Sequence, residues 1–266
     1  MRDEPAPDPS ADPAAEAEGP NTSRRFVLVS DPRTEVPRLV DEDVQHALRV
    51  LRVSAGERIT GLDGRGAAWP LEVLEVSKRA LVLRLAGEPA FVPAPGAGPT
   101  PSIEVAWSLP RGSRAEDSVG RLTQLGAQRF TPLLTHRTPP HAREAGEARR
   151  SRLARAAREA AKQCGRLWFP DLSEPTPLTA WLAARAGTPI AWLDPYAPAS
   201  LLAWDAPRTA RCLALAIGPE GGFTPDEEAL LAAHGAFRAR LGGHVLRLET
   251  AAEAALAVIA TMALPV

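Results

Sequence analysis

Two glycine-rich segments near the carboxyl terminus have the residue types best suited to holding a ligand. The first, Gly218-Pro219-Glu220-Gly221-Gly222, follows a short apolar run. Glycine permits backbone angles closed to other residues and lets a ligand touch the main chain. The segment lacks the Gly-Lys-Ser/Thr of a phosphate-binding P-loop and the GxGxxG fingerprint of a dinucleotide site. The acidic Glu220 also disfavours an enzyme for phosphorylated small molecules, which leaves a ligand held by peptide groups or a plain tight turn.

The second segment runs from Leu241 to Thr250 and contains Gly242-Gly243 followed by His244, Arg247 and Glu249. Both segments come directly after apolar runs of strand length. Two such loops in tandem predict two pliable backbone segments side by side at the edge of a sheet. That arrangement makes a slot for a flat ligand.

The elements that must position these loops alternate between apolar strands and helices. This alternation predicts an α/β fold with a mostly parallel sheet covered on both faces, which binds ligands at the carboxyl ends of its strands. The predicted strands are 103–109, 130–134, 190–193, 213–217 and 237–241, and the predicted helices are 115–125, 147–164 and 178–185.

Each glycine loop is expected to lead into a capped helix. Thr224, Pro225 and Glu227 form a capping box with proline at the first helical position, and Gly235 ends that helix after His234. Thr250 with Glu253 predicts a second capping box, which opens a last helix over 251–262. That helix is apolar nearly all round, so it is either an ordinary core helix or a surface covered by a second subunit.

The amino-terminal part has a different pattern. Short strands at 25–29, 58–62, 69–76 and 80–85, with a helix at 43–50, predict a small β-barrel. The Pro/Gly-rich stretch 91–101 is expected to be a linker. Residues 1–23 carry six acidic and one basic side chain, a net charge of −5, and lack periodicity, which predicts a disordered acidic tail.

Composition excludes several classes of protein. The two cysteines among 266 residues are too few for a disulfide scaffold, and no Cys/His spacing predicts a zinc site. No apolar run approaches the roughly 20 residues of a membrane span, and the first residues lack a signal-peptide profile. We therefore expect a soluble, cytoplasmic protein without a bound metal.

Several motifs together resemble a known family. Ile217–Phe223 (IGPEGGF) and Leu241–Ala251 (LGGHVLRLETA) resemble the signature of SPOUT methyltransferases, which have the α/β-knot fold. Within them the chain is most similar to the bacterial family that methylates N3 of a uridine in small-subunit (16S) ribosomal RNA. Further matches, in the family's order, are Arg24-Arg25-Phe26, His46–Arg52, Asp63-Gly64, Leu125-Gly126-Ala127, Thr131-Pro132-Leu133 and Glu159–Arg166.

The resemblance implies two domains, a cofactor and a partner. Residues 24–90 correspond to a PUA-like RNA-binding barrel and 102–266 to a knotted SPOUT domain. The family binds S-adenosylmethionine in the knot, uses no metal, acts on ribosomal RNA or the small ribosomal subunit, and works as a homodimer, here through the C-terminal helix. The cofactor-binding residues so implied are Leu193, Gly218, Glu220, Gly221, Gly222, Leu241, Val245, Leu246, Leu248 and Thr250.

Methylation of uracil N3 needs a base for its proton and a positive group for the charge that spreads onto the carbonyl oxygens. Arg247 is the candidate for the positive group, with pairing to Glu249 or to an RNA phosphate as its alternative role. Glu249 is the base candidate, in competition with Glu220 and His244. Any of these carboxylates could instead be a helix cap or a salt-bridge partner.

Basic residues indicate an RNA-binding surface. The segment 137–166 carries nine basic and three acidic side chains, a net charge of +6 in a largely helical stretch. Such an excess favours a surface that faces phosphates over an ordinary solvated helix. The candidate RNA contacts are Arg24, Arg25, Arg49, Arg52, Arg65, Arg137 and Arg166.

Some residues depart from the family pattern. Gln124 and His136 stand where the family usually has Glu, and His244 stands where it commonly has Arg. These departures keep open a second hypothesis, a catalytically silent RNA-binding module with the same fold.

Overall fold

The computed structural model describes residues 24–98, 100–143 and 146–264, which form two compact units. The first contains residues up to Val92 together with 165–167, and the second begins at Pro93. The division falls within the stretch 91–101 that was expected to be a linker. The acidic tail, residues 1–23, lies outside the described residues.

The first unit is built on a five-stranded mixed sheet. Its strands pair in the order β1-β2-β3-β4, with β5 on β3, and β1 with β2 is the one parallel pair. Phe26, Trp69 and Leu71 are buried in its core. Its elements are β1 (Arg25–Val27), α2 (Asp41–Arg49), β2 (Arg58–Leu62), β3 (Ala67–Val76), β4 (Leu81–Leu85) and β5 (Ala90–Phe91).

The second unit is built on a seven-stranded, all-parallel sheet in the order β12-β10-β11-β6-β7-β8, with β9 on β7. Its strands are β6 (Ser102–Trp107), β7 (Ala127–Leu134), β8 (Asp171–Leu172), β9 (Thr176–Pro177), β10 (Ile190–Leu193), β11 (Cys212–Ile217) and β12 (Phe237–Ala239). Its helices are α3 (Arg114–Gln124), α4 (Pro140–Arg143), α5 (Glu147–Cys164), α6 (Leu178–Ala183), the 3-10 turn η1 (Leu201–Ala203), α7 (Ala206–Thr209), α8 (Pro225–Ala233) and α9 (Leu248–Met262).

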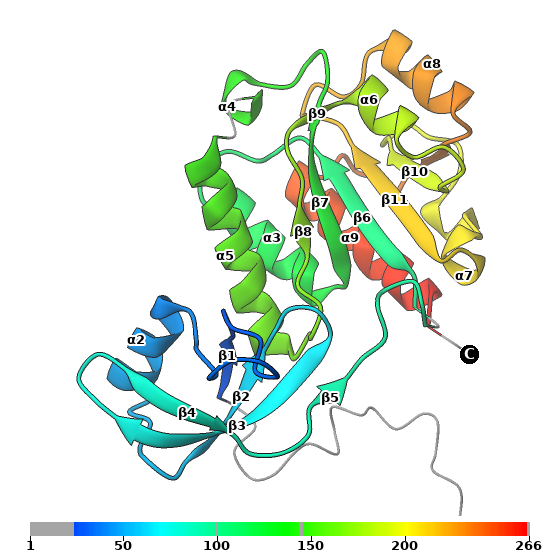
Figure 1. Cartoon of the computed structure of the whole chain (residues 1–266). Coiled ribbons are helices and arrows are strands. Elements are labelled where there is room, and N and C mark those ends of the chain that lie inside the picture. The colour runs from blue at the N-terminus through cyan, green and yellow to red at the C-terminus, as the bar shows by residue number, and fades with distance from the viewer. Residues whose placement is uncertain (1–23, 99, 144–145, 265–266) are drawn as a thin grey trace, which may run out of the picture. The chain divides into compact units, whose positions relative to one another are not determined.

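Helices cover both faces of this sheet (Figure 1). Val105 and Trp107 of β6 point into a core shared with α3, α5 and α9, whereas Ala106 points into a second core with α6 and α8. Successive strand residues face opposite sides, so a continuous apolar run fills both cores. The parallel sheet predicted from these runs is thereby confirmed.

Three expectations about local structure were wrong. Phe91, the first residue of the expected linker 91–101, instead pairs with Ala67 in β5, next to the pair of Ala90 and Ala68. Helix α9 begins at Leu248, before Thr250, and its start has no side-chain cap. Glu253, expected in a capping box, instead reaches across to α3.

That contact is part of a polar strip between α3 and α9. The Glu253 carboxylate accepts a hydrogen bond from Ser118 Oγ at 2.8 Å and pairs with Arg121 Nε at 2.9 Å, and Glu249 pairs with Arg114 at 3.1 Å. Because capping would have needed Glu253 to turn back on its own helix, these tertiary partners account for the missing cap. The strip holds the start of α9 in place beside the sheet.

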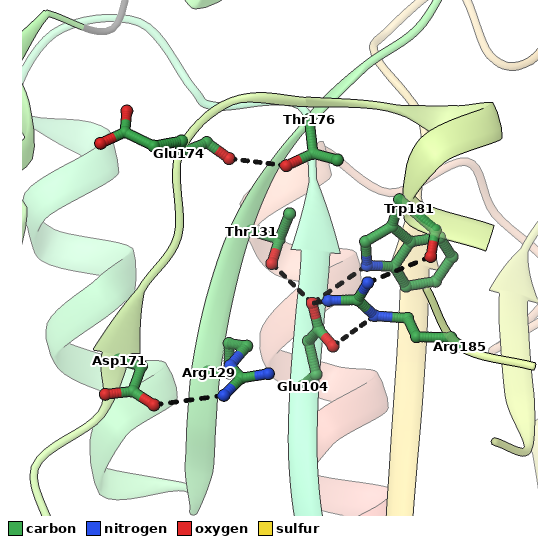
Figure 2. A network of polar contacts seen from close by, with 8 residues as sticks. All are labelled: Glu104, Arg129, Thr131, Asp171, Glu174, Thr176, Trp181 and Arg185. Carbon is green, nitrogen blue, oxygen red and sulfur yellow. Dashed lines mark hydrogen bonds and ion pairs between the residues drawn. The ribbon is translucent and has the colours of Figure 1, made fainter. Parts of the chain in front are cut away.

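A nearly buried charge cluster fastens α6 to the other face (Figure 2). Glu104 of β6 pairs with Arg185, and their side chains are only 11% and 13% exposed. Glu104 also accepts hydrogen bonds from Trp181 Nε1 at 3.0 Å and Thr131 Oγ1 at 2.5 Å. Because Arg185 donates from both Nε and Nη2, the Glu104 carboxylate has four donor atoms, as burial of a charge requires.

We predict that Glu104→Ala lowers the free energy of unfolding by about 3–5 kcal/mol, because it leaves the charge of Arg185, whose side chain is only 13% exposed, without its partner. The exposed pair of Arg129 and Asp171, also drawn in Figure 2, provides the control. Asp171→Ala is expected to cost less than about 1 kcal/mol. Urea unfolding of both variants measures the difference, and equal losses would contradict the structural role given to Glu104.

Candidate functional site

The carboxyl ends of β10, β11 and β12 open into one cavity of about 580 Å³. These three strands are neighbours in the sheet, so the loops that follow them meet at one edge. The lining includes Gly221 and Gly222 from the first glycine loop and Gly242, Val245 and Leu246 from the second. The joint slot expected from the sequence is therefore present.

Packing and a capped helix shape the first glycine loop. Gly218 lies against the ring of Phe223, so that a β-carbon there would come within 3.2 Å of it. Gly222 has a φ of +71°, and its N–H donates to Pro219 O at 2.8 Å. The Thr224 capping box is confirmed, with Thr224 N donating to the Glu227 carboxylate at 2.8 Å.

The second loop presents an exposed run of residues from Gly242 to Arg247. Arg247 is the N-cap of α9, and its carbonyl accepts the first intrahelical hydrogen bond, from Ala251 N at 2.8 Å. The first N–H groups of a helix lack partners within the helix and carry partial positive charge. Since Leu248 and Ala251 line the cavity, the start of α9 contributes to its surface.

Most of the predicted cofactor residues line this cavity, and two predicted site residues do not. Thr250 and Glu249 lie outside the lining. Glu249 is paired with Arg114, with its side chain 13% exposed. The residues that do line it are Leu193, Gly218, Glu220, Gly221, Gly222, Leu241, Val245, Leu246, Leu248 and the predicted catalytic Arg247.

Arg247 is exposed, and within the described residues its guanidinium has neither an ion pair nor a hydrogen bond. The alternative pairing of Arg247 with Glu249 is therefore not what the structure shows. Glu220 and His244, the other candidate bases, both line the cavity and are exposed. The positive group and two possible proton acceptors thus share one cavity, whereas the predicted base Glu249 has another partner.

The rim next to β10 was only partly predicted. Asp194, 8% exposed, accepts a hydrogen bond from Tyr196 N at 2.8 Å and from Arg238 Nε at 2.6 Å. The Arg238 guanidinium lies over the ring of Trp192, 5.2 Å from its centroid. Of this rim, Leu193 was predicted from the sequence, by resemblance. Arg238 lies on β12, and its contact with Asp194 depends on the order of the strands.

Arg137, predicted as an RNA contact, packs against the first glycine loop. Its Nη1 donates to Gly221 O at 2.6 Å and to Phe223 O at 3.1 Å, and the residue lines the cavity. The basic segment that follows is partly tied to the chain itself. Arg149 donates to Pro110 O at 2.5 Å, and burial lowers the pKa of its guanidinium while Glu116 partly offsets that shift.

The other predicted RNA contacts are distributed over the first unit and the end of α5. Arg24 is ion-paired with Glu57, and Arg25 and Arg166 also have partners. Arg49, Arg52 and Arg65 are exposed. Arg52 has a φ of +49°, the one left-handed non-glycine residue in the part of the chain that the structure describes.

Two negative findings concern the described residues. They contain no group of His, Cys, Asp or Glu side chains placed to hold a metal ion. None of their helices is long and apolar enough to cross a membrane.

Comparison with known families agrees with this architecture. Residues 98–260 match the model of an RNA methyltransferase domain, and residues 39–86 match an RNA methyltransferase PUA domain. The ribosomal RNA small subunit methyltransferase E of Synechocystis sp. is 31% identical over 229 residues, which cover 83% of this chain and 71% of that protein. The chain belongs to the ribosomal RNA small subunit methyltransferase E family.

Two further relatives extend the comparison. The family member from Mycobacterium bovis is 30% identical over 244 residues, covering 89% of this chain and 91% of that protein. A methyltransferase structure from Legionella pneumophila, solved with the cofactor SAM bound, is 28% identical with a TM-score of 0.75 and covers 88% of this chain and 96% of that one. In this chain an N-terminal PUA domain precedes a SPOUT-type α/β domain.

The backbone of the first loop gives a test of its shape. Gly222→Ala should lower the free energy of unfolding by about 1–2 kcal/mol, because its φ of +71° is costly for a residue with a β-carbon. The substitution introduces no steric clash, since a β-carbon there meets nothing within 4 Å. Gly242→Ala in the second loop, which has similar space and no left-handed φ, is the control and should cost nothing. Equal losses in urea unfolding would contradict the conformation given to Gly222.

Proposed function

We propose that this chain is an S-adenosylmethionine-dependent methyltransferase that methylates N3 of a uridine in small-subunit (16S) ribosomal RNA. The observation that carries the proposal is the cavity shared by the two glycine loops, in a chain of the methyltransferase E family. Such an enzyme works where ribosomal subunits are assembled, in the cytoplasm.

The lining fits this cofactor. S-adenosylmethionine supplies an activated methyl group when bound, so the chemistry needs no metal. Its adenosine portion requires apolar contact and peptide hydrogen bonds, which Leu193, Leu246 and Leu248 and the glycine-rich backbone offer. The carboxylate of Glu220 complements its positively charged groups and disfavours a phosphorylated ligand in the same place.

The residues of the cavity supply the acid–base chemistry. Uracil N3 carries a proton, and N3 has a lone pair available for attack only after that proton is lost. The resulting negative charge spreads onto the carbonyl oxygens. We assign the stabilisation of that charge to Arg247, because this residue lines the cavity and its guanidinium has no partner among the described residues. Since Glu249 is held by Arg114, we assign proton acceptance to Glu220 or His244.

The RNA side of the proposal rests on charge. Helix α5 carries arginines along its length, and Arg158 is one that makes no hydrogen bond or ion pair within the described residues. Phosphate contacts of this kind position RNA without reading its sequence. The PUA domain adds exposed arginines at positions 49, 52 and 65.

The departures from the family pattern do not favour a silent RNA-binding module. Gln124 lies outside the cavity and donates to the Gln163 side chain at 3.3 Å. His136 uses its backbone N–H, which any residue but proline supplies, to reach Glu227 at 2.7 Å. His244 keeps a titratable side chain in the lining.

We predict that Arg247→Ala lowers the rate of methyl transfer by about a hundredfold or more, since it removes the positive group from the developing charge. Its affinity for S-adenosylmethionine should stay within about threefold of wild type. Transfer of labelled methyl groups to small ribosomal subunits measures the first, and calorimetry the second. Equal losses of transfer and of cofactor affinity would show that Arg247 has a structural role instead.

We also propose that the chain forms a homodimer through α9. One stripe of this helix, Ala254, Ala257 and Thr261, is partly or fully exposed, and Leu264 just beyond it is 59% exposed. Val245 and Leu246 of the second glycine loop, which leads into the same helix, are also exposed apolar residues. A second copy is the occupant that would cover this apolar stripe and complete the cavity next to it.

Ala257→Arg should therefore convert the protein to a monomer in analytical ultracentrifugation, because a charged side chain enters the proposed interface. Ala233→Arg, on the exposed side of α8, is the matched control and should leave the dimer intact. A wild-type protein that sediments as a monomer, or an Ala257→Arg variant that remains a dimer, would overturn the proposal.

A further inference from the structure

We infer that Arg137 is a positioning residue for cofactor binding, which holds the first glycine loop in its binding shape from the turn that follows β7. The inference rests on the proposed function of the cavity. It begins from the two hydrogen bonds that Arg137 Nη1 donates, to Gly221 O at 2.6 Å and to Phe223 O at 3.1 Å. Hydrogen bonds from a charged donor are the stronger ones in proteins.

A rigid turn presents Arg137. Thr135 and Thr138, 5% and 4% exposed, follow the end of β7 and join through their side chains. Thr135 N donates to Thr138 Oγ1 at 2.8 Å, and the two hydroxyls lie 2.9 Å apart. Residues 136 and 137 are thereby displayed at the tip of a buried Thr-x-x-Thr turn.

Arg143 stabilises the same turn through hydrogen bonds to its carbonyl groups. Its Nε donates to Thr138 O at 2.9 Å, and its Nη2 donates to Thr135 O at 2.9 Å and to His136 O at 3.1 Å. Three carbonyl groups of one four-residue turn thus share one guanidinium. The base from which Arg137 extends is well fixed.

A second link joins this turn to the helix that follows the loop. His136 N donates to Glu227 Oε1 at 2.7 Å, while Glu227 Oε2 accepts from Thr224 N at 2.8 Å. The glycine loop is therefore held at two places, by Arg137 at Gly221 and Phe223 and by Glu227 at Thr224. Gly221 and Gly222 have no side chains of their own that could fix the loop.

The aliphatic part of Arg137 packs directly on the glycine. A β-carbon on Gly221 would come within 3.2 Å of Arg137 Cδ and 3.6 Å of its Cβ. A side chain at 221 would therefore press on the arginine where it crosses the loop. Arg137 and Gly221, 84 positions apart in the sequence, are thus parts of one structural unit.

We therefore expect different arginines to serve cofactor binding and RNA binding. A glycine-rich loop loses much conformational entropy when it orders on a ligand, and a brace that orders it beforehand lowers that cost. Arg137 should therefore govern the affinity for the cofactor, whereas an arginine such as Arg158 of α5 should govern the affinity for RNA. The sequence predicted RNA binding for Arg137.

The test compares Arg137→Ala, Arg137→Lys and Arg158→Ala with wild type. We expect Arg137→Ala to raise the Kd for S-adenosylmethionine about tenfold or more, with kcat at saturating cofactor within about threefold of wild type. Arg137→Lys keeps the charge and one donor and should recover most of the affinity. Arg158→Ala should weaken RNA binding and leave the cofactor Kd unchanged. Calorimetry and steady-state kinetics with small ribosomal subunits give these values.

The outcomes separate the inference from what it rests on. Wild-type protein that fails to bind S-adenosylmethionine overturns the proposed function. Wild-type binding with an Arg137→Ala Kd within about twofold overturns the inference alone, and a selective rise in the KM for RNA identifies Arg137 as an RNA contact. A parallel fall in thermal midpoint and kcat for both Arg137 variants would also overturn it, because a structural residue affects every readout.

Discussion

The arrangement of this protein depends on one constraint, that the carboxyl ends of three adjacent parallel strands meet at the same edge of the sheet. Strands β12, β10 and β11 are hydrogen-bonded neighbours, although β12 and β10 are separated in sequence by β11 and two helices. The loops after them are thereby brought to one place. Backbone pairing, which no single side chain determines, creates the cavity in which methyl transfer is proposed to occur.

The strands, most helices and both glycine loops could be predicted because their signals are local. Apolar runs fix β6 and β11, and the Thr224 capping box depends on residues three positions apart. The errors have a common cause. Glu253 satisfied a local capping rule but is held by Ser118 and Arg121 of another helix. Tertiary contacts of this kind have no signature in the sequence.

In the candidate site, too, local features could be predicted from the sequence and tertiary contacts could not. The lining was largely predictable, because nine of the ten expected cofactor residues line the cavity, from the two loops, the end of β10 and the start of α9. The partners of charged residues were not. Arg137 was grouped with RNA contacts because of the basic segment it begins, and Glu249 was taken for a base because it follows a glycine loop. Arg137 has its partner on the loop after β11, at Gly221, and Glu249 has its partner on α3, at Arg114.

The central claim is that one cofactor molecule spans both glycine loops. A crystal structure of the protein grown with S-adenosylhomocysteine tests it most directly. The account predicts ligand density between Gly221 and Leu246, with the adenosine against Leu193. Density bound to one loop only, or a ligand located elsewhere on the chain, would contradict it.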